Sequence, residues 1–263
     1  MTVLSVEKAL LILEYLAAHG GEASLTDVCR ALGLHASTAH HLTATLRERG
    51  FVEQDPKTKR YFLSLLAFEV GQAVRSHQDL KVRAMPHLRR LALESAEDAN
   101  LAVLDKDQVV YIAQAESDRM MRMFTRPGAR APLHATGVGK CLVAWMPHEE
   151  QERLIRRLSF TPCTLHTVRT PDELIRQLAD VRESGFALDR EEREDGVVCI
   201  AAPVRHPQQH VIAAISISGP AARVLGGRYQ HVVDAVKAAA AQVSESLALR
   251  LPLADSSDGE ARQ

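Results

Sequence analysis

One stretch near the N-terminus is rich in side chains that could read DNA. Hydroxyl and imidazole groups, which hydrogen-bond base edges or phosphates, crowd into residues 35–43. If this stretch is helical, five of them can point away from the apolar positions Ala39, Leu42 and Leu46: Ser37, Thr38, His40, His41 and Thr43. Four cations follow that could contact the phosphate backbone: Arg47, Lys57, Lys59 and Arg60. The residue types therefore predict a DNA-reading helix.

The charge balance keeps a second interpretation open. Residues 1–75 carry eight basic and eight acidic side chains, which is poor for a DNA-binding domain and fits a helical dimerisation module with a solvated polar face. Five of the eight cations nevertheless lie between Arg47 and Arg60, against three acids there. This clustering favours DNA binding.

A glycine-rich turn, Gly137-Val138-Gly139-Lys140, could hold an anion. It is not a phosphate-binding P-loop, because that motif needs glycine where His134 stands and serine or threonine where Cys141 stands. The glycines instead allow a close turn before a helix, whose first N–H groups can meet an anion. A purely structural turn is the alternative.

Two cysteines suggest a catalytic alternative. Cys199 or Cys141 could act as a nucleophile with His134 as base and Asp189 as orienting group. Their spacing does not bring them together, and a buried cysteine more often serves as a small apolar residue. We therefore expect no enzyme. Other histidines lack metal-ligand spacing, including His166, His206 and His210, so no metal or cofactor is expected either.

The composition excludes several classes of protein. The 263 residues carry a net charge of -1, which excludes a polybasic protein, and 4% aromatic residues argue against a single-strand binder that stacks bases. No apolar run reaches about 18 residues and the N-terminus lacks a signal-peptide pattern, so we expect a cytoplasmic protein without a membrane partner. Four widely spaced cysteines without a CxxC pair fit reduced thiols.

The elements that must position the polar stretch form a recognisable order. Ser24 and Asp27 predict a capping box, and glycines end each expected helix. The expected helices cover residues 6–17, 25–32 and 36–49, and a hairpin with a charged tip follows over residues 51–63. This order predicts a winged helix-turn-helix domain over residues 1–75.

The rest of the chain has a different pattern. A helical linker is expected over residues 76–97, with Pro86 kinking it or marking a new start. Short apolar strands alternate with helices over residues 98–252, which predicts a mixed α+β domain. The expected strands are 101–104, 108–113, 196–204 and 211–218, and the expected helices are 137–145, 149–158, 171–183 and 229–249. The polar residues 253–263 read as a disordered tail.

Three segments together resemble the isocitrate lyase regulator (IclR) family. They cover about residues 5 to 250 in order: first Ser5-Val6-Glu7-Lys8-Ala9-Leu10, Ile12-Leu13, Leu32-Gly33-Leu34, Ser37-Thr38, Thr45-Leu46, Gly50-Phe51-Val52, Asp55 and Tyr61-Phe62-Leu63; then His134 to Lys140; then Asp189 to Glu192 and Gly196 to Pro220. The resemblance implies a transcription factor with a winged helix-turn-helix joined to a GAF-like effector-binding domain. It implies a dimer or a dimer of dimers.

The resemblance also implies an effector site. Its residues come from the turn, the acidic strand and two further strands: Gly137, Val138, Asp189, Val197, Cys199, Ser216 and Ser218. An apolar wall would be supplied by Met120, Met123 and Ala131. The chain departs from the family at the recognition helix, where an arginine is usual at His41 and a lysine or arginine at Ala36. An imidazole carries charge only at mildly acid pH, so positions 36 and 41 supply no fixed positive charge.

These observations combine into one hypothesis. We expect a regulator that binds a palindromic operator in double-stranded DNA and responds to a small organic acid or an aromatic effector. Repression of a catabolic or transport operon is the first expectation, and activation of such an operon is the alternative. A cysteine-dependent enzyme is the less favoured competitor.

Overall fold

The computed structural model describes residues 2–72, 75–119 and 125–248. Contacts within the chain divide it into two units, Met1–Gln78 and Asp79–Gln263. The predicted tail lies outside the described residues, as do Met120 and Met123. No helix in the described part of the chain has the length and apolar character needed to cross a bilayer.

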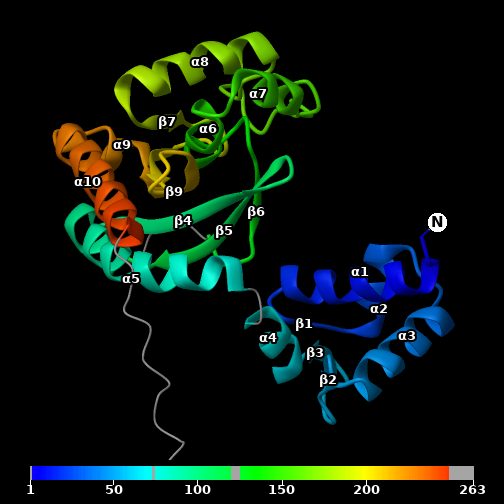
Figure 1. Ribbon diagram of the computed structural model, residues 1–263. Coiled ribbons are helices and arrows are strands. Elements are labelled where there is room, and N and C mark those ends of the chain that lie inside the picture. Colours follow the sequence, from blue (N-terminus) through cyan, green and yellow to red (C-terminus); the bar gives the residue numbers. More distant parts are fainter. Residues whose placement is uncertain (1, 73–74, 120–124, 249–263) are drawn as a thin grey trace, which may run out of the picture. The chain divides into compact units, whose positions relative to one another are not determined.

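The N-terminal unit is a winged helix-turn-helix, as predicted (Figure 1). Its elements are α1 (Leu4–Ala18), β1 (Glu22–Ala23), α2 (Leu25–Leu32), α3 (Ala36–Glu48), β2 (Val52–Gln54), β3 (Tyr61–Leu63) and α4 (Leu65–Gln72). β3 lies between β1 and β2, and both pairings are antiparallel. Ile12, Leu16, Val28 and Val52 form a small buried core beneath the helices.

The turn between α2 and α3 is fixed by local chemistry. The Asp27 N–H donates to Ser24 Oγ at 3.2 Å, and the Asp27 carboxylate accepts from the Ser24 N–H, which completes the predicted capping box. Gly33 ends α2 with φ at 62°, a left-handed conformation that glycine adopts without a steric penalty. The turn is therefore sharp, and α3 starts directly after it.

The C-terminal unit contains one six-stranded sheet (Figure 1). Its elements are α5 (Arg75–Ser95, which begins in the N-terminal unit), β4 (Asp98–Asp105), β5 (Gln108–Ala115), β6 (Arg130–Pro132), α6 (Gly137–Ala144), α7 (His148–Ile155), α8 (Pro171–Ser184), β7 (Ala187–Arg190), β8 (Val197–Arg205), β9 (Val211–Pro220), α9 (Ala221–Val224) and α10 (Tyr229–Ala248). The strand order is β6-β5-β4-β9-β8-β7, and every pairing is antiparallel. The strands and helices confirm the predicted α+β class.

Each face of this sheet buries a separate core. Ile215 and Ile217 pack with α5 and α10 on one face. Ala201 and Ala214 pack with α6 and α8 on the other. Side chains alternate along a strand, so the polar positions of β9 share the α6 side with Ala214. The cavity described below lies on that side.

The helix α5 continues through Pro86. Of the two alternatives expected for Pro86, a kink or a new helical start, the structure excludes the new start. A proline inside a helix removes one backbone hydrogen bond. Here the apolar side of α5, with Leu88 and Leu91 buried against the sheet, holds the helix in place.

Candidate functional site

The polar stretch predicted to read DNA forms the exposed face of α3. Ser37, His40 and His41 are exposed, and Thr38 is half-buried. The imidazoles of His40 and His41 meet edge to face, with ring centroids 6.0 Å apart. α3 is the second helix of the helix-turn-helix, the element that enters the major groove in this type of domain.

Thr43 does not belong to this face. It is fully buried, and its hydroxyl donates to the carbonyl oxygen of Ala39 at 2.8 Å. The prediction that Thr43 points outward is wrong, because position 43 lies one helical turn after the buried Ala39 and shares its side of the helix. The sequence reasoning missed Thr45, which is exposed and lies one turn after His41.

The wing carries the remaining predicted cations. Its tip is held by Asp55, whose carboxylate accepts the N–H groups of Lys57 at 2.7 Å and Thr58 at 2.8 Å. These hydrogen bonds lower the pKa of Asp55. Lys57 and Lys59 are exposed at the tip. The tip therefore presents two cations on a defined turn.

Two further cations are held by neighbouring side chains. Arg60 forms an ion pair with Glu22 at 3.0 Å. Arg47 donates to Gln54 Oε1 at 3.3 Å. Both pairs are exposed, so contact with a phosphate requires only that the side chain exchange one partner for another.

The C-terminal unit contains a cavity of about 210 Å³ on the α6 side of the sheet. Five of the predicted effector residues line it: Ala131, Asp189, Val197, Cys199 and Ser218. The sheet brings three of them together, because Asp189 pairs with Cys199 across β7 and β8, and Cys199 pairs with Ser218 across β8 and β9. Thr136, the N-cap of α6, also lines the cavity, and its hydroxyl accepts the Gly139 N–H at 3.2 Å.

The other predicted effector residues lie elsewhere. Gly137 packs against Cys199, where an added Cβ would be 3.2 Å from the carbonyl oxygen. The Val138 side chain is buried in the core beneath α6, which leaves only its backbone for a ligand. Ser216 is fully buried and is not among the residues that line the cavity.

The sequence reasoning missed part of the cavity wall. Seven further residues line it: Tyr111, Thr125, Ala129, Arg130, Thr136, Arg193 and Glu194. Burial raises the pKa of the Tyr111 phenol. Arg193 directly follows the acidic segment that the family resemblance singles out, and this proximity was the available signal. Tyr111 comes from a strand that the sequence pattern marks only as apolar, and Arg130 comes from β6, a strand that the sequence analysis does not predict.

Burial sets the charge state of the cavity. It raises the pKa of Asp189 to about 7, although Lys140 and the Glu192 N–H, at 2.8 Å from Asp189 Oδ1, favour the carboxylate. Burial likewise raises the pKa of the Cys199 thiol to about 11. The cavity therefore holds a neutral thiol and, near neutral pH, a carboxyl group that is only partly ionised.

The arrangement does not assemble a thiol nucleophile with its base. The Cys141 thiol is fully buried and donates to the Ala201 carbonyl oxygen at 3.1 Å. His134 Nε2 lies 3.2 Å from the carbonyl oxygen of Thr161, and burial lowers the pKa of His134. Within the described ranges, no group of three or more His, Cys, Asp or Glu residues could hold a metal ion.

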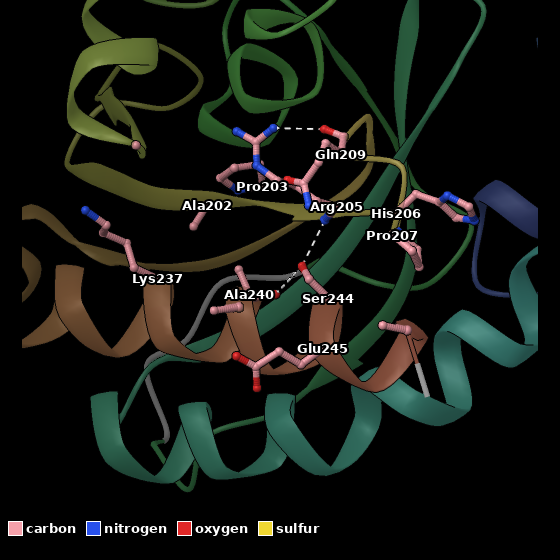
Figure 2. Close-up of a pocket in the computed structure, with 13 residues that line it drawn as sticks. Ala202, Pro203, Arg205, His206, Pro207, Gln209, Lys237, Ala240, Ser244 and Glu245 are labelled. Carbon is pink, nitrogen blue, oxygen red and sulfur yellow. Dashed lines mark hydrogen bonds between the residues drawn. The ribbon is translucent and has the colours of Figure 1, made fainter. Parts of the chain in front are cut away.

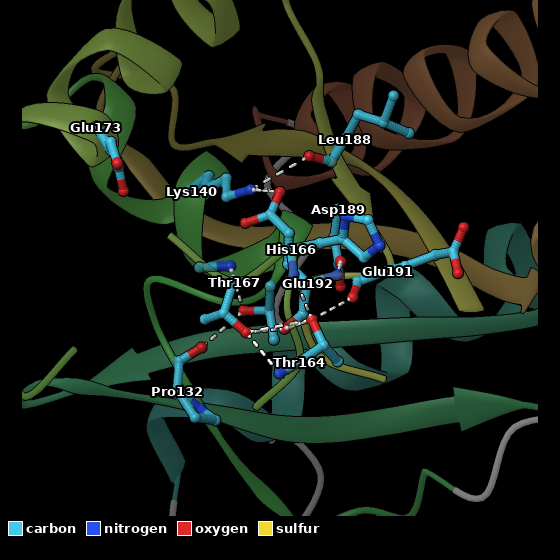
Figure 3. A network of polar contacts seen from close by, with 12 residues as sticks. Pro132, Lys140, Thr164, His166, Thr167, Glu173, Leu188, Asp189, Glu191 and Glu192 are labelled. Carbon is cyan, nitrogen blue, oxygen red and sulfur yellow. Dashed lines mark hydrogen bonds and ion pairs between the residues drawn. The ribbon is translucent and has the colours of Figure 1, made fainter. Parts of the chain in front are cut away.

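A buried ion pair supports the acidic strand (Figure 3). Lys140 Nζ contacts Glu192 Oε1 at 2.5 Å, and both side chains are almost fully buried. Lys140 also donates to the Leu188 carbonyl oxygen, and Thr167 donates to the Glu192 carbonyl oxygen at 2.7 Å. The Lys140 ammonium is therefore occupied inside the protein. Its role is to fix the segment that carries Asp189.

A larger and more open hollow of about 620 Å³ lies between β8 and α10 (Figure 2). Its polar groups bind one another. The Arg205 N–H donates to Ser244 Oγ at 2.9 Å, and the Arg205 guanidinium donates to the Gln209 carbonyl oxygen and lies 4.5 Å from the Trp145 ring centroid. Among the described residues, none of the predicted effector residues lines this hollow.

Comparison with known proteins assigns the chain to a family. The model for the IclR helix-turn-helix domain matches residues 5–56, and the model for the bacterial transcriptional regulator IclR C-terminal domain matches residues 72–245. The chain is 37% identical over 246 residues to the HTH-type transcriptional regulator BhcR of Paracoccus denitrificans, covering 94% of this chain and 88% of BhcR. It is 36% identical over 251 residues to the HTH-type transcriptional repressor AllR of Klebsiella pneumoniae, covering 95% and 92%.

A solved structure agrees with these matches. The IclR transcriptional regulator from Alicyclobacillus acidocaldarius superposes with a TM-score of 0.79 at 27% identity, covering 94% of this chain and all of that chain. Both halves of the sequence thus match in order, and the whole fold matches as well. The chain belongs to the IclR family of bacterial transcriptional regulators.

Proposed function

We propose that this regulator is a repressor that a small carboxylic acid, aliphatic or aromatic, controls from the cavity on the α6 side of the sheet. The observation that carries this proposal is the row Asp189, Cys199 and Ser218 on three adjacent strands, closed over by the start of α6. A thiol, a hydroxyl and a partly protonated carboxyl group suit a small polar ligand. The membership in a family of regulators, and not of enzymes, favours binding over turnover.

The cavity also favours an acid over a neutral ligand. The N-terminal N–H groups of a helix attract an anion, and α6 opens on the cavity at Thr136. Arg130 and Arg193 also line the cavity. The Arg130 guanidinium forms an exposed ion pair with Asp105 at 2.5 Å, and Arg193 Nη1 donates to Cys163 Sγ at 3.2 Å, so a ligand carboxylate would replace these partners. The ligand carboxylate would lie among these groups, and the apolar residues Ala131 and Val197 would contact its carbon skeleton.

On DNA, α3 would enter the major groove and the wing would contact the flanking backbone. Ser37, Thr38, His40 and His41 would contact bases or phosphates from α3, with Arg47, Lys57, Lys59 and Arg60 on phosphates. A palindromic operator calls for two copies of the domain, supplied by a dimer or by one pair within a dimer of dimers, in the cytoplasm. Repression is favoured because the similar AllR is a repressor. Activation is the alternative, because the sign of the regulation depends on where the operator lies relative to RNA polymerase.

The test is a gel shift with DNA from upstream of the protein's own gene, across a series of salt concentrations. A dimer that contacts about seven phosphates should give a log–log slope of affinity against salt near about −6. The double variant Lys57→Ala/Lys59→Ala should bind more weakly with a shallower slope. The matched control Lys81→Ala removes an exposed cation from α5 and should bind like the unchanged protein.

The outcomes separate the parts of the proposal. Binding no tighter than to random DNA would require a selection from random oligonucleotides, and failure there would overturn the DNA-binding role. Release of the complex by a small carboxylic acid would support effector control. A slope that the wing variant leaves unchanged would remove the wing from the interface.

A further inference from the structure

An amide and a hydroxyl on two neighbouring strands are buried without a hydrogen-bond partner. Asn100 lies in β4 and Ser216 in β9, and both are fully buried. Within the described chain, neither Oδ1 nor Nδ2 of Asn100 has a partner, and neither does Oγ of Ser216. The two residues are directly opposite each other in the β4–β9 pairing. Buried polar groups in native proteins are nearly always satisfied, so this pair needs an explanation.

The pair faces the same side of the sheet as the cavity. Residues two apart on a strand share a face, so Ser216 faces the same way as Ser218, which lines the cavity. The Ser216 hydroxyl also lies near the Cys199 thiol and lowers its pKa, although the two groups do not meet hydrogen-bond geometry. Asn100 is two residues along β4 from Asp98, the residue opposite Ser218. The unpaired groups therefore lie about 7 Å along the sheet from the cavity floor.

The charges around the pair decide what it can bind. Asp98 is buried, and its carboxyl oxygens accept the Ser117 N–H at 2.7 Å and the Gln114 side-chain amide at 3.4 Å. Arg130 and Arg193 line the cavity, whereas Asn100 and Ser216 do not. A carboxylate would therefore bind beside these arginines, and the amide and hydroxyl would meet a neutral group.

We propose that Asn100, with Ser216, determines effector specificity by binding a hydroxyl or carbonyl oxygen remote from the effector's carboxylate. An amide and a hydroxyl supply both donors and acceptors, so either oxygen can be satisfied there. A plain acid would leave these groups unpaired, and a site built for a polar group rejects an analogue that lacks it. The inference rests on the proposed function, since it assumes that an acid occupies the cavity.

The experiment compares matched acids on the full-length protein by calorimetric titration. The probes are butyrate against 3-hydroxybutyrate and 4-hydroxybutyrate, and benzoate against 4-hydroxybenzoate. The unchanged protein should bind at least one hydroxy acid tenfold or more tightly than its plain counterpart. Asn100→Leu, which keeps the branched shape, adds some volume and removes the amide, should reduce that preference to within twofold while plain acids bind as before. Ser216→Ala should reduce it in part.

A matched control separates specificity from a general effect on the core. Gln177 on α8 also has a buried, unpaired side-chain oxygen in the described part of the chain, and it does not line the cavity. Gln177→Leu removes the same kind of group and should leave the hydroxy-acid preference unchanged. A loss of preference in both variants would mean that the effect is a general one, and the proposal would fall.

A second measurement needs no ligand. If Asn100 is kept for binding, replacing it with leucine removes an unpaired amide, and the melting temperature of the ligand-free protein should rise. If the amide is instead held by a permanent internal water, the melting temperature should fall, and the proposal is overturned. The proposal would also be overturned if the ratio of the affinities for hydroxy and plain acids were the same in Asn100→Leu as in the unchanged protein. Absence of binding by every acid would instead overturn the proposed function.

Discussion

Asp189 couples the cavity to pH. Its pKa rises from 3.8 to about 7 in the folded protein because the carboxyl group is buried. Between these values the folded protein binds more protons than the unfolded chain, so the free energy of unfolding falls as pH rises from about 4 to about 7. Above pH 7 this contribution is constant. For a pKa shift of this size, the total decrease in the free energy of unfolding is on the order of 4 kcal/mol.

We therefore expect Asp189→Asn to flatten the pH dependence of stability. The variant keeps a neutral side chain at every pH, so its unfolding free energy should gain most over that of the unchanged protein at pH 7 and above. Urea unfolding at a series of pH values measures this difference. Asp234→Asn, which alters an exposed carboxylate on α10, is the control. Parallel curves for Asp189→Asn and the unchanged protein would contradict the assignment.

His41 is the second residue for which we predict a measurable effect, here on operator binding. It is exposed on α3, where the family usually has arginine. An arginine is always charged and can bind a phosphate with two hydrogen bonds. His41→Arg should strengthen operator binding about tenfold at low salt, and in a dimer it should steepen the salt slope by about two. His19→Arg, an exposed position at the end of α1, should change neither; equal effects would remove His41 from the interface.

At the scale of elements, the start of α6 depends on one close contact. A Cβ at Gly139 would lie closer to the Leu133 carbonyl oxygen than any real contact allows, because the preceding segment crosses the first turn of the helix. Gly139→Ala should therefore lower the unfolding free energy by about 1–3 kcal/mol and weaken acid binding. Gly71→Ala in α4 meets open space and should be neutral or slightly stabilising. Thermal unfolding of both variants measures the contrast.

The elements also show where sequence reasoning succeeded and failed. Ser24, Asp27 and Gly33 act through neighbours in the chain, so α2 and its turn were predictable from local spacing. Thr43 was misplaced because a hydroxyl was treated as outward-facing without regard to its position one turn after Ala39. A new helical start at Pro86 was one of two expectations, and α5 instead continues through it, with Leu88 and Leu91 buried against the sheet.

The cavity was predictable only in part for a related reason. Asp189, Cys199 and Ser218 were named from a family resemblance, and the strand register then places them side by side. Asn100 and Tyr111 lie on strands whose pattern reads simply as apolar. Their importance depends on which strands become neighbours, and local sequence carries no signal for that pairing.

For the whole molecule, the division into two units has a thermodynamic consequence. Each unit has its own buried core, and the cavity residues belong to the C-terminal unit alone. Differential scanning calorimetry should therefore resolve two transitions. A bound acid should raise only the transition of the C-terminal unit, by mass action, whereas operator DNA should raise the other. A single transition that shifts as a whole with either ligand would contradict this.

The strand order determines when each part of the fold can form while the chain is being synthesised. β4 is made early and must wait for β9, its neighbour in the centre of the sheet, before Asn100 can meet Ser216. Contacts between distant parts of a chain form slowly, whereas the N-terminal unit is built from neighbours and leaves the ribosome first. A ribosome that stops before β9 would release a chain whose winged helix is complete and whose ligand site does not yet exist. Such a fragment could bind DNA and would not respond to the effector.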